Sequence, residues 1–160
     1  MMTHGVIDSP VGPLRIEMSD RGLRQLHFTD ETPDQVDAQV TGQIFEELHA
    51  YFRGELRAFT VPVDLSGVTD FTRKVLEATA TIPYGQTVSY GEIARMIGMP
   101  GATQAVGNAL GANPVPIVVP CHRVIRSDGS MGWFTGGPQI KRALLRLEGI
   151  DFPEQAALPM

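Results

Sequence analysis

The sequence predicts an α+β protein with a strand-rich N-terminal part and a mostly helical C-terminal part. Up to residue 28, apolar and polar residues alternate as in strands with one buried face, whereas from residue 71 the apolar residues recur at helical spacing. An extended, proline-containing stretch at residues 61–67 separates the two patterns. We therefore expect an N-terminal lobe at residues 1–66 and a C-terminal lobe at residues 67–160.

Alternating segments at residues 4–8, 13–18 and 23–28 predict a small antiparallel sheet, because turn signals separate them. Thr32-Pro33-Asp34 then begins a helix, with the proline at a position that suits it, and Gly54 ends that helix. The histidines of this part have no charged constellation around them. We expect the N-terminal lobe to serve as a scaffold.

The C-terminal lobe begins with three predicted helices. Apolar spacing predicts a helix at residues 71–80. Ser89 and Glu92 form a capping box that begins a second helix. Its buried stripe is predicted to comprise Ile93, Ala94, Met96 and Ile97. A tight turn at residues 98–101 leads to a third helix at residues 102–110. Helix, turn, helix is the geometry of many DNA readers, although most such pairs serve only for packing.

The most informative stretch surrounds the only cysteine of the chain. The apolar residues 117–119 predict a short buried strand that ends at Pro120 and delivers Cys121 at a turn. A thiolate is a strong nucleophile, and the neighbouring His122 and Arg123 are expected to lower the thiol pKa from its usual value of about 8.5. An isolated cysteine is more often an inert buried residue, but this charged setting favours a nucleophile.

Two further segments flank the cysteine. Asn113 begins a rigid proline-containing turn, which its amide is expected to hold because it can satisfy several backbone groups. The glycine-punctuated loop at residues 132–137 carries Trp133 and Phe134, which either pack within the loop or form a lid that stacks on a ligand. A last helix is predicted at residues 141–148, followed by a loose tail.

Composition excludes several classes of protein. No apolar run approaches the 18 residues or so of a membrane span, and the N-terminus has no secretory pattern. One cysteine excludes an internal disulfide, and with four scattered histidines it makes a structural zinc site improbable. We expect a cytoplasmic protein without a metal.

The net charge of −5 is unevenly distributed. Residues 1–70 hold five arginines and twelve acids, whereas residues 71–148 hold eight basic and four acidic residues, and the remaining tail holds two acids. A basic half beside an acidic half suggests that a polyanion binds to one face, although charges scattered by chance are an alternative. The modest excess of four positive charges predicts few phosphate contacts and salt-sensitive binding.

The run Pro120-Cys121-His122-Arg123-Val124 resembles the active-site signature of the O6-alkylguanine-DNA alkyltransferases, also called methylated-DNA–protein-cysteine methyltransferases. The resemblance extends over residues 70–149. It includes residues 82–85, Ser89-Tyr90, residues 105–114, Gly136-Gly137, Lys141 and residues 144–149. It implies a ribonuclease-H-like N-terminal lobe and a C-terminal lobe with a helix-turn-helix, winged-helix-like DNA-binding motif.

This resemblance implies direct-reversal DNA repair. A flipped O6-alkylguanine in double-stranded DNA would transfer its alkyl group to Cys121, with His122 as the base, acting through a water, and Glu148 as the group that orients His122. A thioether has no hydrolytic exit, so each molecule would act once. No cofactor is implied, and we expect the protein to act as a monomer.

The resemblance also assigns groups that contact the base. Tyr90 would donate a proton to the departing purine, and the backbone N–H of Thr135 would meet the leaving oxygen. The backbone carbonyls of Cys121 and Val124 would read the exocyclic amine, while Asn113 supports the catalytic turn. The second helix of the pair would enter the minor groove. The positions expected on the substrate and DNA side are Ser89, Gln104, Ala105, Gly107, Arg123, Val124, Trp133, Phe134, Thr135 and Lys141.

Three positions depart from the family pattern. Gln104 stands where the family typically has an arginine that fills the gap left by the extruded base. We therefore expect weaker DNA binding or slower base extrusion. Trp133 stands where a small or polar residue is usual, and Phe134 replaces a tyrosine, so both affect the size and alkyl preference of the pocket.

Three alternatives stay open at this point. The first is a non-catalytic sensor of alkylation damage on the same fold, although in such relatives the reactive cysteine is replaced. The second is an alkyltransferase specialised for bulky adducts, which the three departures suggest. The third is a thiol hydrolase with multiple turnovers, which would leave the helix-turn-helix unexplained.

Overall fold

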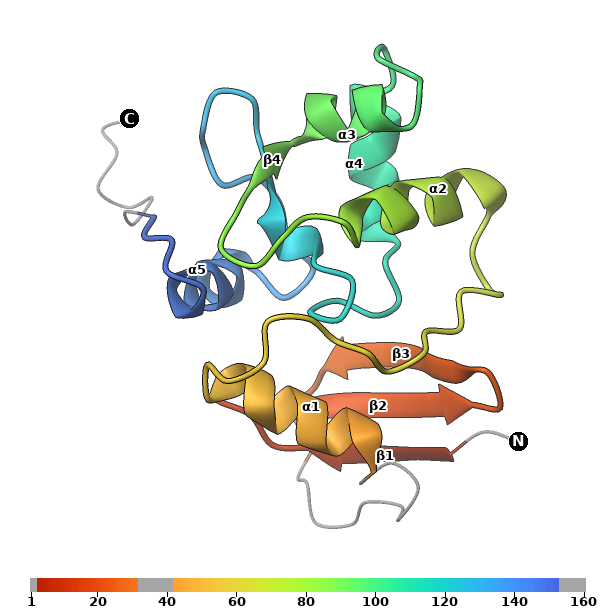
Figure 1. Cartoon of the computed structure of the whole chain (residues 1–160), viewed down its shortest axis with the longest axis vertical. Coiled ribbons are helices and arrows are strands. Elements are labelled where there is room, and N and C mark those ends of the chain that lie inside the picture. The colour runs from red at the N-terminus through yellow and green to blue at the C-terminus, as the bar shows by residue number, and fades with distance from the viewer. Residues whose placement is uncertain (1–2, 32–41, 153–160) are drawn as a thin grey trace.

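The computed structural model describes residues 3–31 and 42–152, and it confirms the predicted α+β architecture. Figure 1 shows a three-stranded sheet and α1 at one end of the molecule, and α2, α3 and α4 at the other. In chain order the elements are β1 (Thr3–Ile7), β2 (Leu14–Ser19), β3 (Gly22–Phe28), α1 (Gln43–Phe52), α2 (Asp70–Thr79), β4 (Val88–Ser89), α3 (Tyr90–Met96), α4 (Thr103–Gly111), the 3-10 turn η1 (Cys121–Arg123), β5 (Val124–Ile125) and α5 (Pro138–Leu147).

The N-terminal sheet is antiparallel, with its strands in the order β1, β2, β3. Alternation places Leu14, Ile16 and Leu26 on the buried side, and α1 covers the sheet with Ile44 and Leu48 (Figure 1). The predicted beginning of this helix at residues 32–34 lies outside the described residues.

The C-terminal helices follow the sequence signals closely. The predicted capping box is present, because the Ser89 hydroxyl accepts from Glu92 N at 3.0 Å and the Glu92 carboxylate accepts from Ser89 N at 2.9 Å. The predicted buried stripe of α3 is partly wrong, since Met96 is 50% exposed. Only Ile93 and Ala94 of α3 are buried, because this short helix packs with one side against α2 and α4.

The predicted strand at residues 117–119 is wrong, because this segment forms a turn. Ile117 and Val119 are buried as expected and Val118 is partly buried, but Pro114 and Pro116 have no backbone N–H to offer a neighbouring strand. The segment closes on itself through a single bridge between Pro116 and Val119. Ile117 adopts a φ of 77°, which is strained backbone for a β-branched residue.

The two lobes share one continuous apolar core. The connector between them runs along the edge of β3, where Leu23 N donates to Pro62 O at 2.7 Å. From the same strand, Leu26 N donates to Pro114 O of the C-terminal lobe at 2.8 Å. The loop that leads to Cys121 is therefore anchored on the N-terminal sheet. In the described part of the chain, no helix is long and apolar enough to cross a membrane.

Candidate active site

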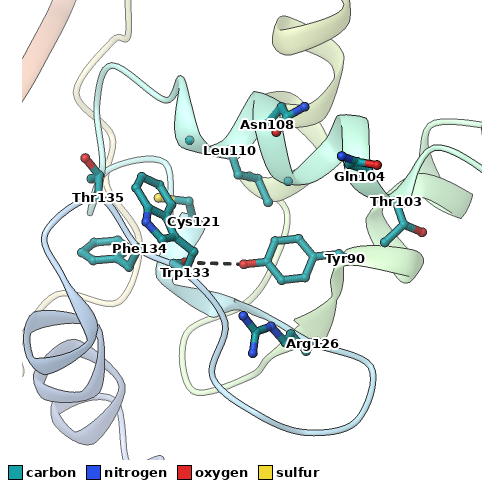
Figure 2. A pocket seen from close by; sticks show the side chains of 12 residues that line it. Tyr90, Thr103, Gln104, Asn108, Leu110, Cys121, Arg126, Trp133, Phe134 and Thr135 are labelled. Atoms are coloured by element: carbon teal, nitrogen blue, oxygen red, sulfur yellow. Dashed lines mark hydrogen bonds between the residues drawn. The ribbon is translucent and has the colours of Figure 1, made fainter.

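Cys121 lies at the beginning of the η1 turn, beside a cavity of about 570 Å³. Its backbone N–H donates to Val119 O at 2.8 Å, and the residue is only 7% exposed. Figure 2 shows the cavity between α4, the start of α3 and the loop around Trp133. The lining residues are Tyr90, Thr103, Gln104, Gly107, Asn108, Leu110, Gly111, Cys121, Arg126, Trp133, Phe134 and Thr135.

Asn113 ties the turn before the cysteine together. Its side-chain oxygen accepts from Val115 N at 3.0 Å, and its amide nitrogen donates to Val119 O at 3.0 Å. Both bonds are buried, so they fix the backbone from which Cys121 follows.

The resting thiol is protonated, contrary to the sequence-based expectation. Burial raises the pKa of Cys121 to about 11, against the smaller opposing effects of the Asn113 side chain and the Lys141 charge. Arg123 does not lower the pKa of Cys121 as expected, because its guanidinium donates to Glu148. The thiol therefore needs a base to become a nucleophile at neutral pH.

Glu148, just after α5, is the centre of a buried hydrogen-bond network. Its Oε1 accepts from Arg123 Nε at 2.8 Å and from Gly85 N at 3.2 Å. Its Oε2 accepts from Tyr51 Oη at 2.5 Å, His122 Nε2 at 2.8 Å and Arg123 Nη2 at 3.0 Å. Burial opposes ionisation, but the hydrogen bonds from His122 and Arg123 outweigh it and lower the pKa of Glu148 to about 2.

The surroundings of His122 favour its neutral form. Burial lowers its pKa, against the opposing effect of the hydrogen bond to Glu148. Because an ionised carboxylate can only accept, Nε2 of His122 carries the hydrogen and Nδ1 carries a lone pair. Among the described side chains, Nδ1 of His122 is the one buried nitrogen or oxygen without a hydrogen-bond partner. This atom is available to receive a proton.

Arg123 and Lys141 were predicted on the substrate and DNA side, but the structure places both in the interior. Besides its bonds to Glu148, Arg123 donates to Ile82 O at 2.7 Å. Lys141 Nζ donates to Val124 O at 2.7 Å and to Trp133 O at 3.3 Å, and burial lowers the pKa of Lys141 to about 8. Both cations therefore hold backbone near the cysteine rather than reach towards phosphates.

Two more predicted positions are engaged in backbone structure. Val124 pairs with Val88 in the parallel β4–β5 ladder, and its carbonyl accepts from Lys141 Nζ; Val124 is not among the residues that line the cavity. Ser89 uses its hydroxyl as the cap of α3.

Tyr90 projects from the first position of α3 into the cavity (Figure 2). Its hydroxyl donates to Trp133 O at a long 3.5 Å, and burial raises its pKa, so the phenol keeps its proton. Gly132 makes room for this ring, because a Cβ there would lie 2.8 Å from Tyr90 Oη. Tyr90 therefore presents a protonated phenol beside the cavity.

The exposed face of α4 carries small and uncharged residues. Val106, Ala109 and Leu110 are buried, whereas Gln104 and Ala105 face outwards. Gly107, which is partly buried, and Gln104 both line the cavity, with Gln104 near its outer end (Figure 2). A second surface could approach this helix closely.

The two aromatic residues of the loop have different surroundings. Phe134 is 3% exposed and packs edge-on against Phe28 of the N-terminal lobe, with ring centroids 5.8 Å apart. Trp133 is 61% exposed, and a Cβ on Gly111 would lie 3.4 Å from its ring. Phe134 anchors the loop, whereas Trp133 forms an open wall of the cavity next to Thr135 (Figure 2).

The sequence did not point to several residues of the site. Tyr51 belongs to the N-terminal lobe, 97 positions from the glutamate that it contacts, and no motif marks it. Arg126 lines the cavity, and its only signal was its place in the basic half of the chain. Gly111, the last residue of α4, faces the Trp133 ring. Within residues 3–31 and 42–152, no three His, Cys, Asp or Glu side chains gather to hold a metal ion.

Comparison with known proteins agrees with this site. The family model of the 6-O-methylguanine DNA methyltransferase DNA-binding domain matches residues 70–150, and that of the ribonuclease-like domain matches residues 2–65. A Mycobacterium tuberculosis protein named methylated-DNA–protein-cysteine methyltransferase is 45% identical over 164 residues, covering 99% of each chain. The chain belongs to the methylated-DNA–protein-cysteine methyltransferase family. The resemblance drawn from the sequence, including its ribonuclease-like N-terminal lobe, is thus confirmed.

Solved structures of the family include complexes with DNA. The structure of Mycobacterium tuberculosis OGT in complex with DNA has a TM-score of 0.83 and 47% identity, covering 91% of both chains. S. pombe Atl1, solved with damaged DNA containing O6-carboxymethylguanine, has a TM-score of 0.50 and 37% identity, covering 54% of this chain and 82% of that one.

Proposed function

We infer that this protein repairs O6-alkylguanine in double-stranded DNA by transferring the alkyl group to Cys121. The observation that carries this inference is the position of the thiol, which lines a cavity and precedes in the chain a buried histidine whose Nδ1 has no hydrogen-bond partner. The family membership and the DNA-bound relatives support the same reaction.

The proposed step is a displacement at the alkyl carbon. Through a bridging water, Nδ1 of His122 takes the thiol proton, and a new bond forms between sulfur and carbon while the bond between carbon and guanine O6 breaks. The electron pair stays on the guanine, and the Tyr90 hydroxyl supplies the proton that neutralises it. The proton held by His122 then returns to Tyr90 by way of water, so in the net reaction one hydrogen moves from the thiol to guanine and the alkyl group moves to sulfur. The thioether has no leaving group for hydrolysis, so each molecule reacts once.

The base has to leave the duplex to reach Cys121, because an alkyl carbon inside stacked DNA is inaccessible. A cavity of about 570 Å³ beside α4 can receive it, while the small exposed residues of α4 allow a close approach to the minor groove. Gln104, which is exposed on α4 and lines the cavity, is the residue that we propose fills the gap in the stack. A thiol that has to stay reduced suits the cytoplasm, where we place the protein.

The test is the intact mass of the protein after incubation with duplex DNA containing O6-methylguanine. We expect a stoichiometric gain that corresponds to one methyl group replacing the thiol hydrogen, and no gain with unmodified DNA or in Cys121→Ser. Lesion binding without a change in mass would instead identify a damage sensor. Release of more than one product per protein molecule would identify a hydrolase.

A further inference from the structure

Tyr51 connects the N-terminal lobe to the proposed catalytic network. It lies on α1 and is fully buried, and its hydroxyl donates to Glu148 Oε2 at 2.5 Å. The same hydroxyl lies 3.5 Å from His122 Nε2. A buried hydroxyl that reaches across a lobe boundary to the carboxylate of a His–Glu pair is placed to influence the base as well as to fill space.

Tyr51 and His122 share one acceptor, Oε2 of Glu148, and this determines the effect that Tyr51 can have on His122. His122 Nε2, Tyr51 Oη and Arg123 Nη2 all donate to Oε2 of Glu148, so they share the same negative charge. Each further donor to a carboxylate oxygen reduces the stabilisation that the carboxylate gives to an imidazolium. The tyrosine hydroxyl therefore weakens the effect by which Glu148 would otherwise keep His122 protonated.

We propose that Tyr51 is a positioning residue that keeps His122 neutral, so that Nδ1 can accept the thiol proton at physiological pH. The proposal rests on the function proposed above and extends it, because it makes the N-terminal lobe a participant in the chemistry rather than only a scaffold. Tyr51 itself touches neither the cysteine sulfur nor the cavity lining in the described contacts.

The other charged groups around His122 act in both directions. Arg123 and Lys141 disfavour a positive charge on His122 from η1 and α5, and Glu148 favours it. Tyr84 contacts the ring of Tyr51 and lies under Arg123, but its hydroxyl donates to Leu147 O at 3.2 Å. Cys121 is uncharged at neutral pH.

Tyr51→Phe removes the hydroxyl and keeps the ring, which packs against Phe52 and Phe59. Tyr84→Phe is the matched control, since it removes another tyrosine hydroxyl without touching the Glu148 carboxylate. Thermal melting of both variants checks that the fold is retained. Four histidines allow residue-specific ¹⁵N labelling and assignment of the His122 ring by NMR.

We expect the titration midpoint of His122 in Tyr51→Phe to rise by about one pH unit, and that in Tyr84→Phe to match wild type. Single-turnover methyl transfer should slow in Tyr51→Phe as the pH falls through the His122 midpoint, by up to about ten-fold at the lowest pH, and approach the wild-type rate at alkaline pH. A rate loss that is uniform over pH, or an unchanged His122 titration, would overturn the proposal. If wild type itself gains no methyl group, the proposed function fails, but the NMR titration still decides the role of Tyr51.

Discussion

The surroundings of Cys121 differ between two sides. The inner side is the protein interior, with the charged side chains of Glu148, Arg123 and Lys141, and the outer side is the cavity, with the partly apolar walls that include Trp133 and Tyr90. On the inner side, Glu148 accepts five hydrogen bonds, and Arg123 and Lys141 donate to backbone carbonyls. On the outer side, Trp133 is mostly exposed and Tyr90 makes one long hydrogen bond. The inner side fixes the protonation states that the reaction needs, and the outer side determines what can enter.

The difference has an energetic reason. A buried charge is tolerated only when its partners satisfy it, so removing one partner leaves the other unpaired at a high cost. An exposed side chain of the cavity wall can be removed without leaving an unpaired group, because water takes its place. Substitutions on the inner side should therefore change stability, and substitutions on the outer side should change selectivity and DNA binding.

The largest effect is expected for Glu148→Gln. The neutral amide leaves the guanidinium of Arg123 buried without its counter-ion, so the free energy of unfolding should fall by about 3–5 kcal/mol in urea denaturation. Glu55→Gln is the control, because the Arg53–Glu55 pair is 58% and 63% exposed, and it should change stability by less than about 1 kcal/mol. Equal losses of unfolding free energy in Glu148→Gln and Glu55→Gln would contradict the expected difference between the buried and the exposed ion pair.

Acid should act on the inner side as well. The pKa of Glu148 is about 2 in the folded protein, against 4.5 ordinarily. Between these two pH values the unfolded chain binds more protons than the folded protein does, so the free energy of unfolding decreases as the pH decreases. Glu148 alone should account for a loss of about 3 kcal/mol between pH 5 and pH 2. His122, whose pKa is also lowered, adds a loss that begins near pH 6.5. Urea unfolding at several pH values should show a weaker acid dependence in Glu148→Gln than in wild type.

On the outer side, Trp133→Ala should leave the free energy of unfolding within about 1 kcal/mol of wild type, because the indole is 61% exposed. Removing the wall should raise the rate of benzyl transfer relative to methyl transfer by about ten-fold in competition assays. Phe134→Ala in the same loop is the contrast, since its ring is buried and its loss should cost about 3–5 kcal/mol. An unchanged rate ratio would show that Trp133 does not limit adduct size.

The smallest effect is expected for Gln104→Arg. An added positive charge on α4 should tighten DNA binding a few-fold and steepen the slope of log affinity against log salt by about one. Fluorescence anisotropy over a range of salt concentrations measures both quantities. If neither the affinity nor the methyl transfer rate changes, Gln104 is not at the DNA surface.

Local signals predicted local structure well. The capping box at Ser89 and Glu92 begins a helix because both partners lie within one turn of chain. The strand predicted at residues 117–119 failed because β-branched propensity is weaker than two prolines and the Asn113 amide, which fold the segment into a turn.

The electrostatics of the site could not be predicted from neighbours in the sequence. Cys121 and Arg123 are close in the chain, but the η1 turn points the guanidinium at Glu148, and burial then dominates the thiol pKa. Tyr51 reaches the network only through the packing of α1 against the C-terminal lobe, which no local pattern encodes.

Ile117 has a positive φ and is 1% exposed. Its backbone conformation favours glycine or asparagine, whereas its buried position favours a large apolar side chain. Glycine would relax the backbone but leave a cavity in the core, and asparagine would suit the φ angle but bury an unpaired amide. In a saturation library this position should therefore be as intolerant as the reactive site itself. Evolutionary drift there would require coordinated change in the loop and in its packing partners.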